Sequence, residues 1–352
     1  MAAYKDKERN TWFCKFTYID RMGNRKQKKK RGFKRKRDAL QWEREFLTSS
    51  GLECPETFRD LVNYYMDDIS VRCRESTIET KKYVIDTKLI PFFGNRKVEE
   101  ITPAMVRTWQ AAMIRLNYKP TYLRFMHTQL SSILNYAVIY YGLKDNPCVK
   151  AGAIGKAKPR EMDFWTEDEY RTFISAVPDG SKYKYIFEIL YWSGIREGEL
   201  QALTKEDIDL DRKTISITKT YVKIRNGIEL INPPKTEGSR RKVFIPDFLC
   251  AELRPFLDSR QPGERLFQAP RTSIRNALIR YSEKAGTKAI RVHDLRHSHA
   301  SLLINMGLSP KVIAQRLGHE NIQTTLNIYS HLYPSAQEEV ADMLQNLYEA
   351  SK

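Results

Sequence analysis

The chain has 352 residues, too many for one ordinary hydrophobic core, so two or three domains are expected. Its Lys and Arg residues outnumber Asp and Glu by 60 to 43, a formal net charge of +17, while 41% of all residues are hydrophobic. This balance excludes a disordered basic tail and favours a folded protein with a polyanionic partner, most commonly nucleic acid. A basic surface that is merely solvated is the alternative.

The cysteines and the hydropathy pattern narrow the class further. The five cysteines are widely spaced and never form a CxxC pair, which argues against a disulfide framework or a zinc finger and for a reducing cytosol. The start, MAAYKDKERNTWF, lacks the apolar region of a secretory signal. No stretch approaches the ~18–20 apolar residues of a membrane span. We therefore expect a soluble intracellular protein with no membrane partner.

Residues 1–50 form the most basic segment. TWFCKFTYID (11–20) alternates as a strand does, GN (23–24) indicates a turn, and the basic run RKQKKKRGF (25–33) follows. KRDALQWEREFL (36–47) is typical of a helix. We expect a small α+β DNA-binding domain with a three-stranded sheet and one helix, because a ribbon of strands fits the major groove. The alternative is that the basic run resembles a nuclear-localisation signal or is merely solvated. The residues expected to contact DNA are Lys28, Lys29, Lys30 and Arg31.

Residues 55–149 are expected to form an all-α helical bundle. Thr57 is predicted to cap a helix over FRDLVNYYMDDI. A second helix is predicted to begin near Ser76 and to end before Pro91. Apolar residues recur at helical spacing in these stretches, which indicates a core-facing stripe.

The bundle is predicted to continue with two more helices. One has Thr102 as its N-cap, and a long one starts after Pro120 and ends at Gly142. Several basic side chains lie on the polar faces: Lys81, Lys82, Arg107, Arg115, Lys119 and Arg124. Of these, the ones expected to contact DNA are Lys81, Lys82 and Arg124.

Residues 150–163, KAGAIGKAKPREMD, predict an interdomain linker because they are small, basic and without periodicity. TEDE (166–169) then matches a capping box that opens a helix. The third domain is therefore expected over 164–352, mainly α-helical with a small antiparallel sheet. Alternating residues and an NG turn within 214–246 predict that sheet.

Polar residues gather in four separate clusters of this third domain. SGIREGEL (193–200) places Arg196 at a helix N-terminus, a natural anion site, with Glu199 one turn later. PPKTEGSRR predicts a loop between strands with Lys235 near its tip. Taken singly, each is as well explained by an ordinary solvated side chain.

HDLRHSHA (293–300) is the third cluster. On a helix, His293 lies one turn from Arg296 and from His297. Two histidines at this spacing could ligate a metal, but the glutamate of an HExxH site is missing and no third ligand accompanies them. We expect no metal here.

The fourth cluster spans 309–332. Ser309 and Pro310 are predicted to open a helix that Gly318 ends. His319 follows in a loop, and Tyr329 lies near the end of a second short helix.

Together these residues form an ordered set of Arg, Lys, His-x-x-Arg, His and Tyr in a strongly basic chain. GIREGEL, HDLRH, LGH and the following tyrosine match the signature of the tyrosine recombinases in wording as well as in order. The chain thus resembles the integrases of phages and conjugative transposons over its whole catalytic half. The positions that match the catalytic signature are Arg196, Lys235, His293, Arg296, His319 and Tyr329.

Cleavage of a phosphodiester by a tyrosine needs a nucleophile, neutralisation of the phosphoryl oxygens and a proton for the leaving oxygen. Tyr329 would be the nucleophile, and Arg196 and Arg296 would clamp the non-bridging oxygens. His297 and His299 are expected to be structural or to face DNA.

The resemblance implies the remaining roles. Lys235 is the general acid for the leaving 5′-OH, and His293 is the general base or proton shuttle. His319 donates to the phosphate, and Glu199 organises the site. Neither a cofactor nor a metal is implied.

The resemblance also implies the domain roles and the partners. Residues 1–50 would bind arm-type DNA sites and residues 55–149, a SAM-like domain, the core site. A homotetramer would act on double-stranded attachment sites through a Holliday junction, possibly aided by a host DNA-bending protein and an excisionase, in the bacterial cytoplasm at the nucleoid. The tail helix would pack in a neighbouring subunit, or in its own as the alternative, through Ala336, Val340, Met343 and Leu347.

Two other classes compete with the recombinase. A type IB topoisomerase uses similar chemistry but relaxes supercoils without exchanging strands between sites. A non-catalytic DNA-binding regulator explains the charge but not the ordered catalytic set.

Overall fold

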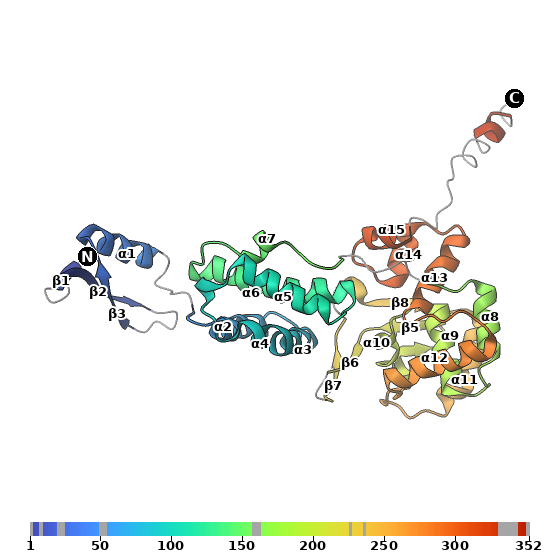
Figure 1. Cartoon of the computed structure of the whole chain (residues 1–352). Coiled ribbons are helices and arrows are strands. Elements are labelled where there is room, and N and C mark those ends of the chain that lie inside the picture. The colour runs from blue at the N-terminus through green and yellow to red at the C-terminus, as the bar shows by residue number, and fades with distance from the viewer. Residues whose placement is uncertain are drawn as a thin grey trace. The chain divides into compact units, whose positions relative to one another are not determined.

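The computed structural model divides the chain into two compact units, Met1–Pro159 and Arg160–Lys352 (Figure 1). Lys235, the GN turn and three of the four predicted tail-stripe residues (Ala336, Val340, Met343) lie outside the described residues. The fourth, Leu347, lies in a short helical stretch and is exposed. The structure describes residues 3–6, 10–19, 25–48, 55–156, 163–224, 227–234, 237–329 and 344–349.

The N-terminal part is an antiparallel sheet with one helix, which confirms the prediction of a three-stranded sheet and a helix. Strands β1 (Ala3–Asp6), β2 (Thr11–Ile19) and β3 (Arg25–Phe33) pair in that order, and α1 (Lys36–Thr48) follows. Alternation along β2 sends Phe16 toward the helix, where its ring lies 5.2 Å from that of Phe46 and 5.8 Å from that of Trp42. The helix therefore covers one face of the sheet.

The opposite face of this sheet is not covered by α1. Tyr4 and Phe13 stack on it with ring centroids 5.4 Å apart. Lys29 lies 4.6 Å and Arg31 5.9 Å from the centroid of the Phe13 ring, so both cations share this open face. Lys30 instead lies 4.7 Å from the Trp42 ring, on the side of the helix.

Residues 55–156 form a helical bundle, and the capping residues that the sequence indicated act as expected. Thr57 and Asp60 form a reciprocal capping box, and the Thr102 hydroxyl accepts from the Met105 amide. Gly142 ends the long helix with φ +70°, a conformation that suits glycine. The helices are α2 (Phe58–Ser70), α3 (Glu75–Val84), α4 (Ile90–Phe93), α5 (Pro103–Arg115), α6 (Pro120–Tyr141) and α7 (Pro147–Ala151), with a 3₁₀ turn over Val98–Glu100.

The prediction that the second helix ends before Pro91 is wrong. After α3 the chain makes a π-helical turn over Ile85–Leu89, in which the Ile90 amide donates to the Ile85 carbonyl, and α4 then continues through Pro91. Proline lacks an amide proton and clashes with the carbonyl four residues earlier in a regular α-helix. The wider π turn removes that conflict, so the helix bulges and does not stop.

The first residues of the predicted linker pack on the bundle. Lys150 and Ala151 belong to α7, and the Lys156 amide donates to the Pro120 carbonyl at 3.2 Å. Gly155 has φ +75°, and a Cβ atom there would lie 2.0 Å from the Pro120 oxygen. Only glycine permits this close approach.

The second unit is mainly helical, as predicted, and its core is built from aromatic and aliphatic side chains that include Trp165, Phe173 and Leu253. It contains α8 (Glu167–Ser175), α9 (Lys182–Ser193), α10 (Glu197–Leu200), β4 (Ile208–Asp209), β5 (Thr214–Ile217), β6 (Thr220–Lys223), β7 (Glu229–Asn232), β8 (Arg241–Phe244), α11 (Asp247–Asp258), α12 (Arg271–Ala285), α13 (Asp294–Asn305), α14 (Pro310–Leu317) and α15 (Ile322–Tyr329), with 3₁₀ turns over Lys205–Asp207 and Glu237–Ser239.

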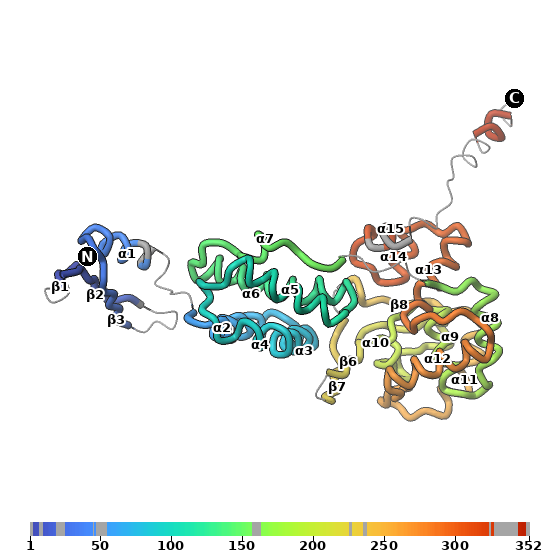
Figure 2. The backbone as a smooth tube through the Cα atoms, viewed as in Figure 1, coloured from blue at the N-terminus to red at the C-terminus, as the bar shows by residue number. Residues whose placement is uncertain are grey.

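The strands form two small sheets, where the sequence predicted one. β5 pairs with β4 and with β8, whereas β6 and β7 pair only with each other. Strands β6 and β7 pair in antiparallel fashion, and their hairpin extends away from the rest of the unit (Figures 1 and 2). Strand β4 has only two residues and gives no sequence signal.

Helix α13 runs through the interior of this unit. The Asp294 carboxylate fixes its start by accepting from the Arg291 amide at 2.8 Å and from the Arg291 guanidinium at 2.7 Å. One turn later the Ser298 hydroxyl accepts from the Trp165 amide at 2.9 Å. Polar side chains on this helix are therefore anchors of the core.

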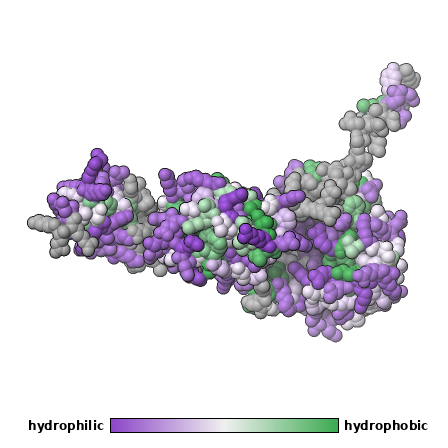
Figure 3. All heavy atoms as spheres, viewed as in Figure 1, coloured by the Kyte–Doolittle hydropathy of each residue, from purple (hydrophilic) through white to green (hydrophobic). Residues whose placement is uncertain are grey.

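The surface visible in Figure 3 is mainly hydrophilic over both units, in keeping with the 29% of charged residues. Among the helices that the structure describes, none is long and apolar enough to cross a membrane.

The structure separates two neighbouring lysines that the sequence grouped as DNA contacts. The Lys81 ammonium donates to the Tyr65 hydroxyl at 3.1 Å and to Gln129 Oε1 at 2.8 Å, joining α3 to α2 and α6, whereas Lys82 is exposed. We expect Lys81→Met to lower the free energy of unfolding by about 1–3 kcal/mol, because the amide of Gln129 would be left buried without its partner. The matched change Lys82→Met should cost less than about 0.5 kcal/mol. Urea unfolding of the two variants tests this; equal losses would contradict it.

Candidate active site

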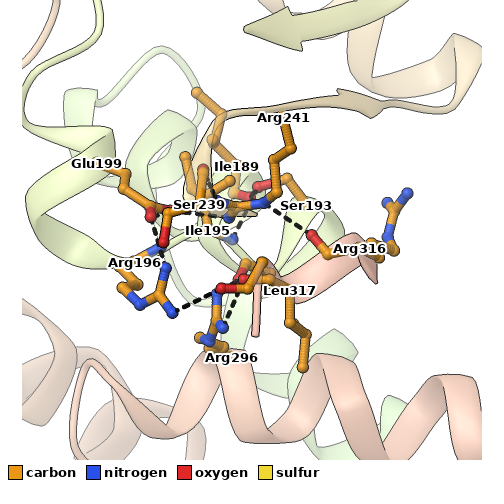
Figure 4. A network of polar contacts seen from close by, with 12 residues as sticks. Ile189, Ser193, Ile195, Arg196, Glu199, Ser239, Arg241, Arg296, Arg316 and Leu317 are labelled. Carbon is orange, nitrogen blue, oxygen red and sulfur yellow. Dashed lines mark hydrogen bonds and ion pairs between the residues drawn. The ribbon is translucent and has the colours of Figure 1, made fainter. Parts of the chain in front are cut away.

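The end of α14 receives hydrogen bonds from three arginines (Figure 4). Arg241 Nε donates to the carbonyl of Arg316 at 2.9 Å, Arg296 Nη2 to that of Leu317 at 2.7 Å, and Arg196 Nη2 to that of Gly318 at 3.2 Å. The last carbonyls of a helix have no partner within the helix and carry its negative dipole end. The three consecutive carbonyls therefore gather three cations that come from distant parts of the chain.

Glu199 lies between two of these arginines. Its Oε1 accepts from Arg196 Nη1 at 2.8 Å and from Arg241 Nη1 at 3.2 Å. Its Oε2 accepts from the Arg196 amide at 2.9 Å and from Arg241 Nη2 at 2.8 Å. Burial alone would raise the pKa of this carboxyl, but the hydrogen bonds and charges of Arg241 and Arg196 outweigh it and lower the pKa.

Two glycines make this close assembly possible. Gly194 ends α9 with φ +67°, its carbonyl accepts from Arg296 Nη1 at 2.7 Å, and a Cβ atom there would lie 2.5 Å from the ring of His299. Gly318 ends α14 with φ +68°, and a Cβ atom there would lie 2.9 Å from Arg241 Nη1. Both positions need the left-handed conformation and also the missing side chain.

His319 follows this helix end directly. Its Nδ1 lies 2.8 Å from the hydroxyl of Thr325, a fully buried residue of α15. This contact fixes the ring and leaves Nε2 as the other polar atom. Desolvation lowers the pKa of His319 to about 4, aided by the positive charges of Arg296, Arg196 and Arg241, so the ring is neutral at pH 7.

His293 is the first of the three histidines around α13. It occupies the N-cap position of the helix, and its side chain is exposed. Partial desolvation and then the charge of Arg296 lower its pKa. The rings of His293 and His297 meet edge to face with centroids 5.0 Å apart.

His297 and His299 are buried, which resolves the two alternatives for them in favour of a structural position. Arg316 Nε donates to His299 Nε2 at 2.9 Å, so that nitrogen is an acceptor and the ring is neutral. Desolvation, followed by the charge of Arg316, lowers the pKa of His299 to about 3. Desolvation, followed by the charge of His293, lowers that of His297 to about 4.

The structure brings together most of the predicted catalytic positions that it describes. Arg196, Glu199 and Arg296 converge on the segment that carries His319, and the charges of both arginines act on His293. Tyr329 is the last residue of α15, four residues after Thr325, and only its backbone is described. Among the described residues, no group of three potential metal ligands lies together.

The predicted DNA contacts lie in the first unit, away from this cluster in sequence. Lys28 and Lys30 stand opposite Phe16 and Cys14 on the helix side of the sheet, and Lys29 stands opposite Lys15 on the other side. In the bundle, Arg124 is partly buried on α6. The predicted set is therefore divided between different faces.

Three side chains of the site were missed by sequence reasoning: Arg241, Arg316 and Thr325. A signal existed for Arg241, because alternation along β8 places it on the same face as the buried Val243. No pattern marked Arg316 or Thr325, since each owes its position to how α14 packs against its neighbours.

Comparison with known proteins agrees with this geometry. Residues 163–336 match the phage integrase family, residues 57–114 its N-terminal SAM-like domain and residues 2–50 an Arm DNA-binding domain. The chain belongs to the phage integrase family. This integrase is therefore related to the tyrosine recombinases, enzymes that break and rejoin DNA, and the recombinase prediction is confirmed.

Individual relatives are similar to this chain over most of its length. The ICEBs1 integrase of Bacillus subtilis (strain 168) is 29% identical over 308 residues, covering 83% of this chain and 83% of that protein. The Tn1549 transposon integrase in complex with a circular intermediate DNA has the same fold, with a TM-score of 0.67 and 18% identity over 83% of this chain and 100% of that one. The fold is also similar to that of a lambda integrase tetramer bound to a Holliday junction, with a TM-score of 0.56 and 17% sequence identity. That match covers 91% of this chain and 95% of the lambda integrase chain.

The pKa values of the buried histidines give a test of the site's electrostatics. His297 and His319, with pKa values of about 4, and His299, with about 3, are expected to remain neutral when folded at slightly acid pH. In the unfolded chain they would protonate near ~6.5. Their contribution to stability is thus complete above that pH and is lost as the pH falls toward 4, by at most about 1.4 kcal/mol per pH unit for each ring.

Histidine NMR of the DNA-free protein between neutral pH and about pH 5.5 measures this directly, since that range spans the ordinary midpoint near ~6.5. As the pH falls, the rings of His297, His299 and His319 should keep the chemical shifts of neutral imidazole, while the melting temperature of the protein declines. Titration of all rings near the ordinary value would contradict the burial of the site.

Proposed function

We propose that this integrase is a site-specific recombinase that integrates and excises a mobile element by forming a 3′-phosphotyrosyl bond with DNA. The observation that carries the proposal is the convergence of Arg196 and Arg296 on adjacent carbonyls of α14, directly before His319. Two guanidinium groups held at one place form a site for the non-bridging oxygens of a phosphodiester.

The arginines differ in how much of each remains open to a ligand. The Arg196 side chain is 37% exposed. Within the described part of the chain its guanidinium group donates two hydrogen bonds, to Glu199 and to the Gly318 carbonyl. Arg296 is buried and donates to Gly194 and Leu317. Arg196 would therefore supply most direct contacts to the phosphate, while Arg296 would supply a fixed charge beneath it. Loss of one such stabilising contact costs roughly 10²–10³ in rate.

Tyr329 would attack the phosphorus atom, and the bond from phosphorus to the 5′ oxygen would break. His293, neutral at pH 7, would take the proton of the tyrosine hydroxyl, and Lys235 would give a proton to the leaving 5′ oxygen. His319 would donate from Nε2 to a non-bridging oxygen, with Thr325 holding Nδ1. A new phosphodiester replaces the old one, so rejoining would need no external energy source.

The domain division that suits this function is an arm-binding domain over 1–50, a core-binding domain over 55–149, a linker over 150–163 and a catalytic domain over 164–352. The partner would be double-stranded DNA of core and arm-type attachment sites, in the bacterial cytoplasm. A homotetramer would exchange strands through a Holliday junction; a related integrase has been captured in that state. A host DNA-bending protein and an excisionase would determine whether the element is integrated or excised.

The open face of the N-terminal sheet is the natural surface for arm-type DNA. Lys29 and Arg31 flank the stacked pair of Tyr4 and Phe13 there, with Lys15 opposite Lys29. Cations beside exposed aromatic rings fit a phosphate backbone and base edges. Lys28 and Lys30 lie on the side of α1 and would contribute less.

The nucleophile is tested by covalent trapping on a nicked, labelled core-site duplex. Wild-type protein should form an adduct that survives SDS and chelation of divalent metals, and Tyr329→Phe should form none. Lys235→Met should form it slowly, because the 5′ oxygen would leave without a proton. An adduct that persists in Tyr329→Phe would mean that another residue attacks; no adduct from wild type on DNA that it binds would favour a regulator.

Arm binding is tested with DNA from the ends of the element. Deleting residues 1–50 should abolish binding to the accessory repeats and leave core-site binding. Lys29→Gln should reduce the slope of log K against log salt concentration by about 1, as for one lost phosphate contact. Lys30→Gln, which removes the same charge from the helix side, is the control. Equal slopes for both variants would refute the assignment of the open face.

A further inference from the structure

Arg241 is a third arginine of the active-site network, and the functional assignment above gives it no role. Its side chain is only 7% exposed. Nε donates to the Arg316 carbonyl at 2.9 Å, and Nη1 donates to the Ser239 carbonyl at 3.1 Å and to Glu199 at 3.2 Å. Nη2 donates to Glu199 at 2.8 Å. With four of its five N–H groups used inside the protein, Arg241 is turned away from any phosphate.

The charge balance at Glu199 shows what Arg241 supplies. The carboxylate is 4% exposed and accepts from Arg196 as well as from Arg241. Two guanidinium groups and one carboxylate leave one positive charge for the phosphate. Without Arg241, the buried carboxylate would be neutralised by Arg196 alone, and the pair would carry no net charge.

The geometry of Arg241 also connects three segments that the reaction uses. It begins β8, just after the 3₁₀ turn over Glu237–Ser239, and donates to the carbonyl of Ser239 in that turn. It reaches α10 through Glu199 and the end of α14 through Arg316, two residues before Gly318. Gly318 in turn must lack a side chain because Arg241 occupies that space.

We propose that Arg241 is a positioning residue of the recombinase: it offsets the charge of Glu199, so that Arg196 keeps its charge for the scissile phosphate, and it fixes the turn at Ser239 and the segment that carries His319 relative to Arg196. The inference rests on the proposed function, because it assigns a role within the same site. It differs from a catalytic role in that Arg241 touches no substrate.

The test is single-turnover cleavage of the nicked core-site duplex by the full chain at saturating protein. Arg241→Met should bind the duplex as wild type does and cleave it ~10²-fold more slowly, as for a misplaced catalytic group. Lys242→Met is the matched control, because Lys242 is the next residue of β8, carries the same charge and is exposed on the opposite face. It should cleave at close to the wild-type rate.

The double variant Arg241→Met with Glu199→Gln separates the charge effect from simple packing. Removing the carboxylate restores one net positive charge beside Arg196, so the double variant should cleave faster than Arg241→Met. If Arg241 served only to pack β8 against its neighbours, Glu199→Gln would lower the cleavage rate further. A double variant slower than Arg241→Met would overturn the proposal.

Arg241→Lys keeps the inference testable if the methionine variant does not fold. Lysine keeps the charge, but one ammonium group cannot hold both oxygens of Glu199 and the Arg316 carbonyl, so the rate should fall between those of wild type and Arg241→Met. A wild-type rate for Arg241→Lys or Arg241→Met would refute the positioning role while leaving the recombinase intact. No adduct from wild type would remove the proposed function and this inference together.

Discussion

The site depends on the end of one short helix. Three consecutive carbonyls, of Arg316, Leu317 and Gly318, each accept from a different arginine, and these arginines come from β8, α13 and the start of α10. At a helix C-terminus several carbonyl acceptors that lack a partner within the helix face the same way. It therefore serves as a template on which like charges can be held close together, which free side chains in water would resist.

The electrostatics of the surrounding groups follow from this concentration of charge. A single buried carboxylate, Glu199, relieves the repulsion between Arg196 and Arg241, and its pKa is lowered in return. Desolvation and the nearby guanidinium groups lower the pKa values of His293 and His319 as well, and for an imidazole a lowered pKa means that the ring is uncharged at neutral pH. Neutral imidazoles can take or donate one proton, so in the proposed reaction the arginines would bind charge while the histidines would be available for proton transfer.

Much of this arrangement was predictable from the sequence, because helices, caps and catalytic positions leave local signals. The cap at Thr57, the capping box at Thr166 and the glycine at 142 all gave correct expectations, and the order of the polar clusters indicated the correct family. The helix end predicted before Pro91 was wrong, because a π turn accommodates the proline within the helix. No feature of the composition signals such a turn. Arg241 was overlooked because a basic residue in a basic run looks solvated until the strand is seen to turn it inward.

The contact between His319 and Thr325 links two parts of the chemistry through one hydroxyl group. Thr325 lies in α15, which also carries Tyr329 at its end. If α15 moved from its place, the proposed nucleophile and the orientation of His319 would be lost in the same event. Displacement of this one helix would therefore disable the proposed cleavage as a whole, because both groups depend on α15.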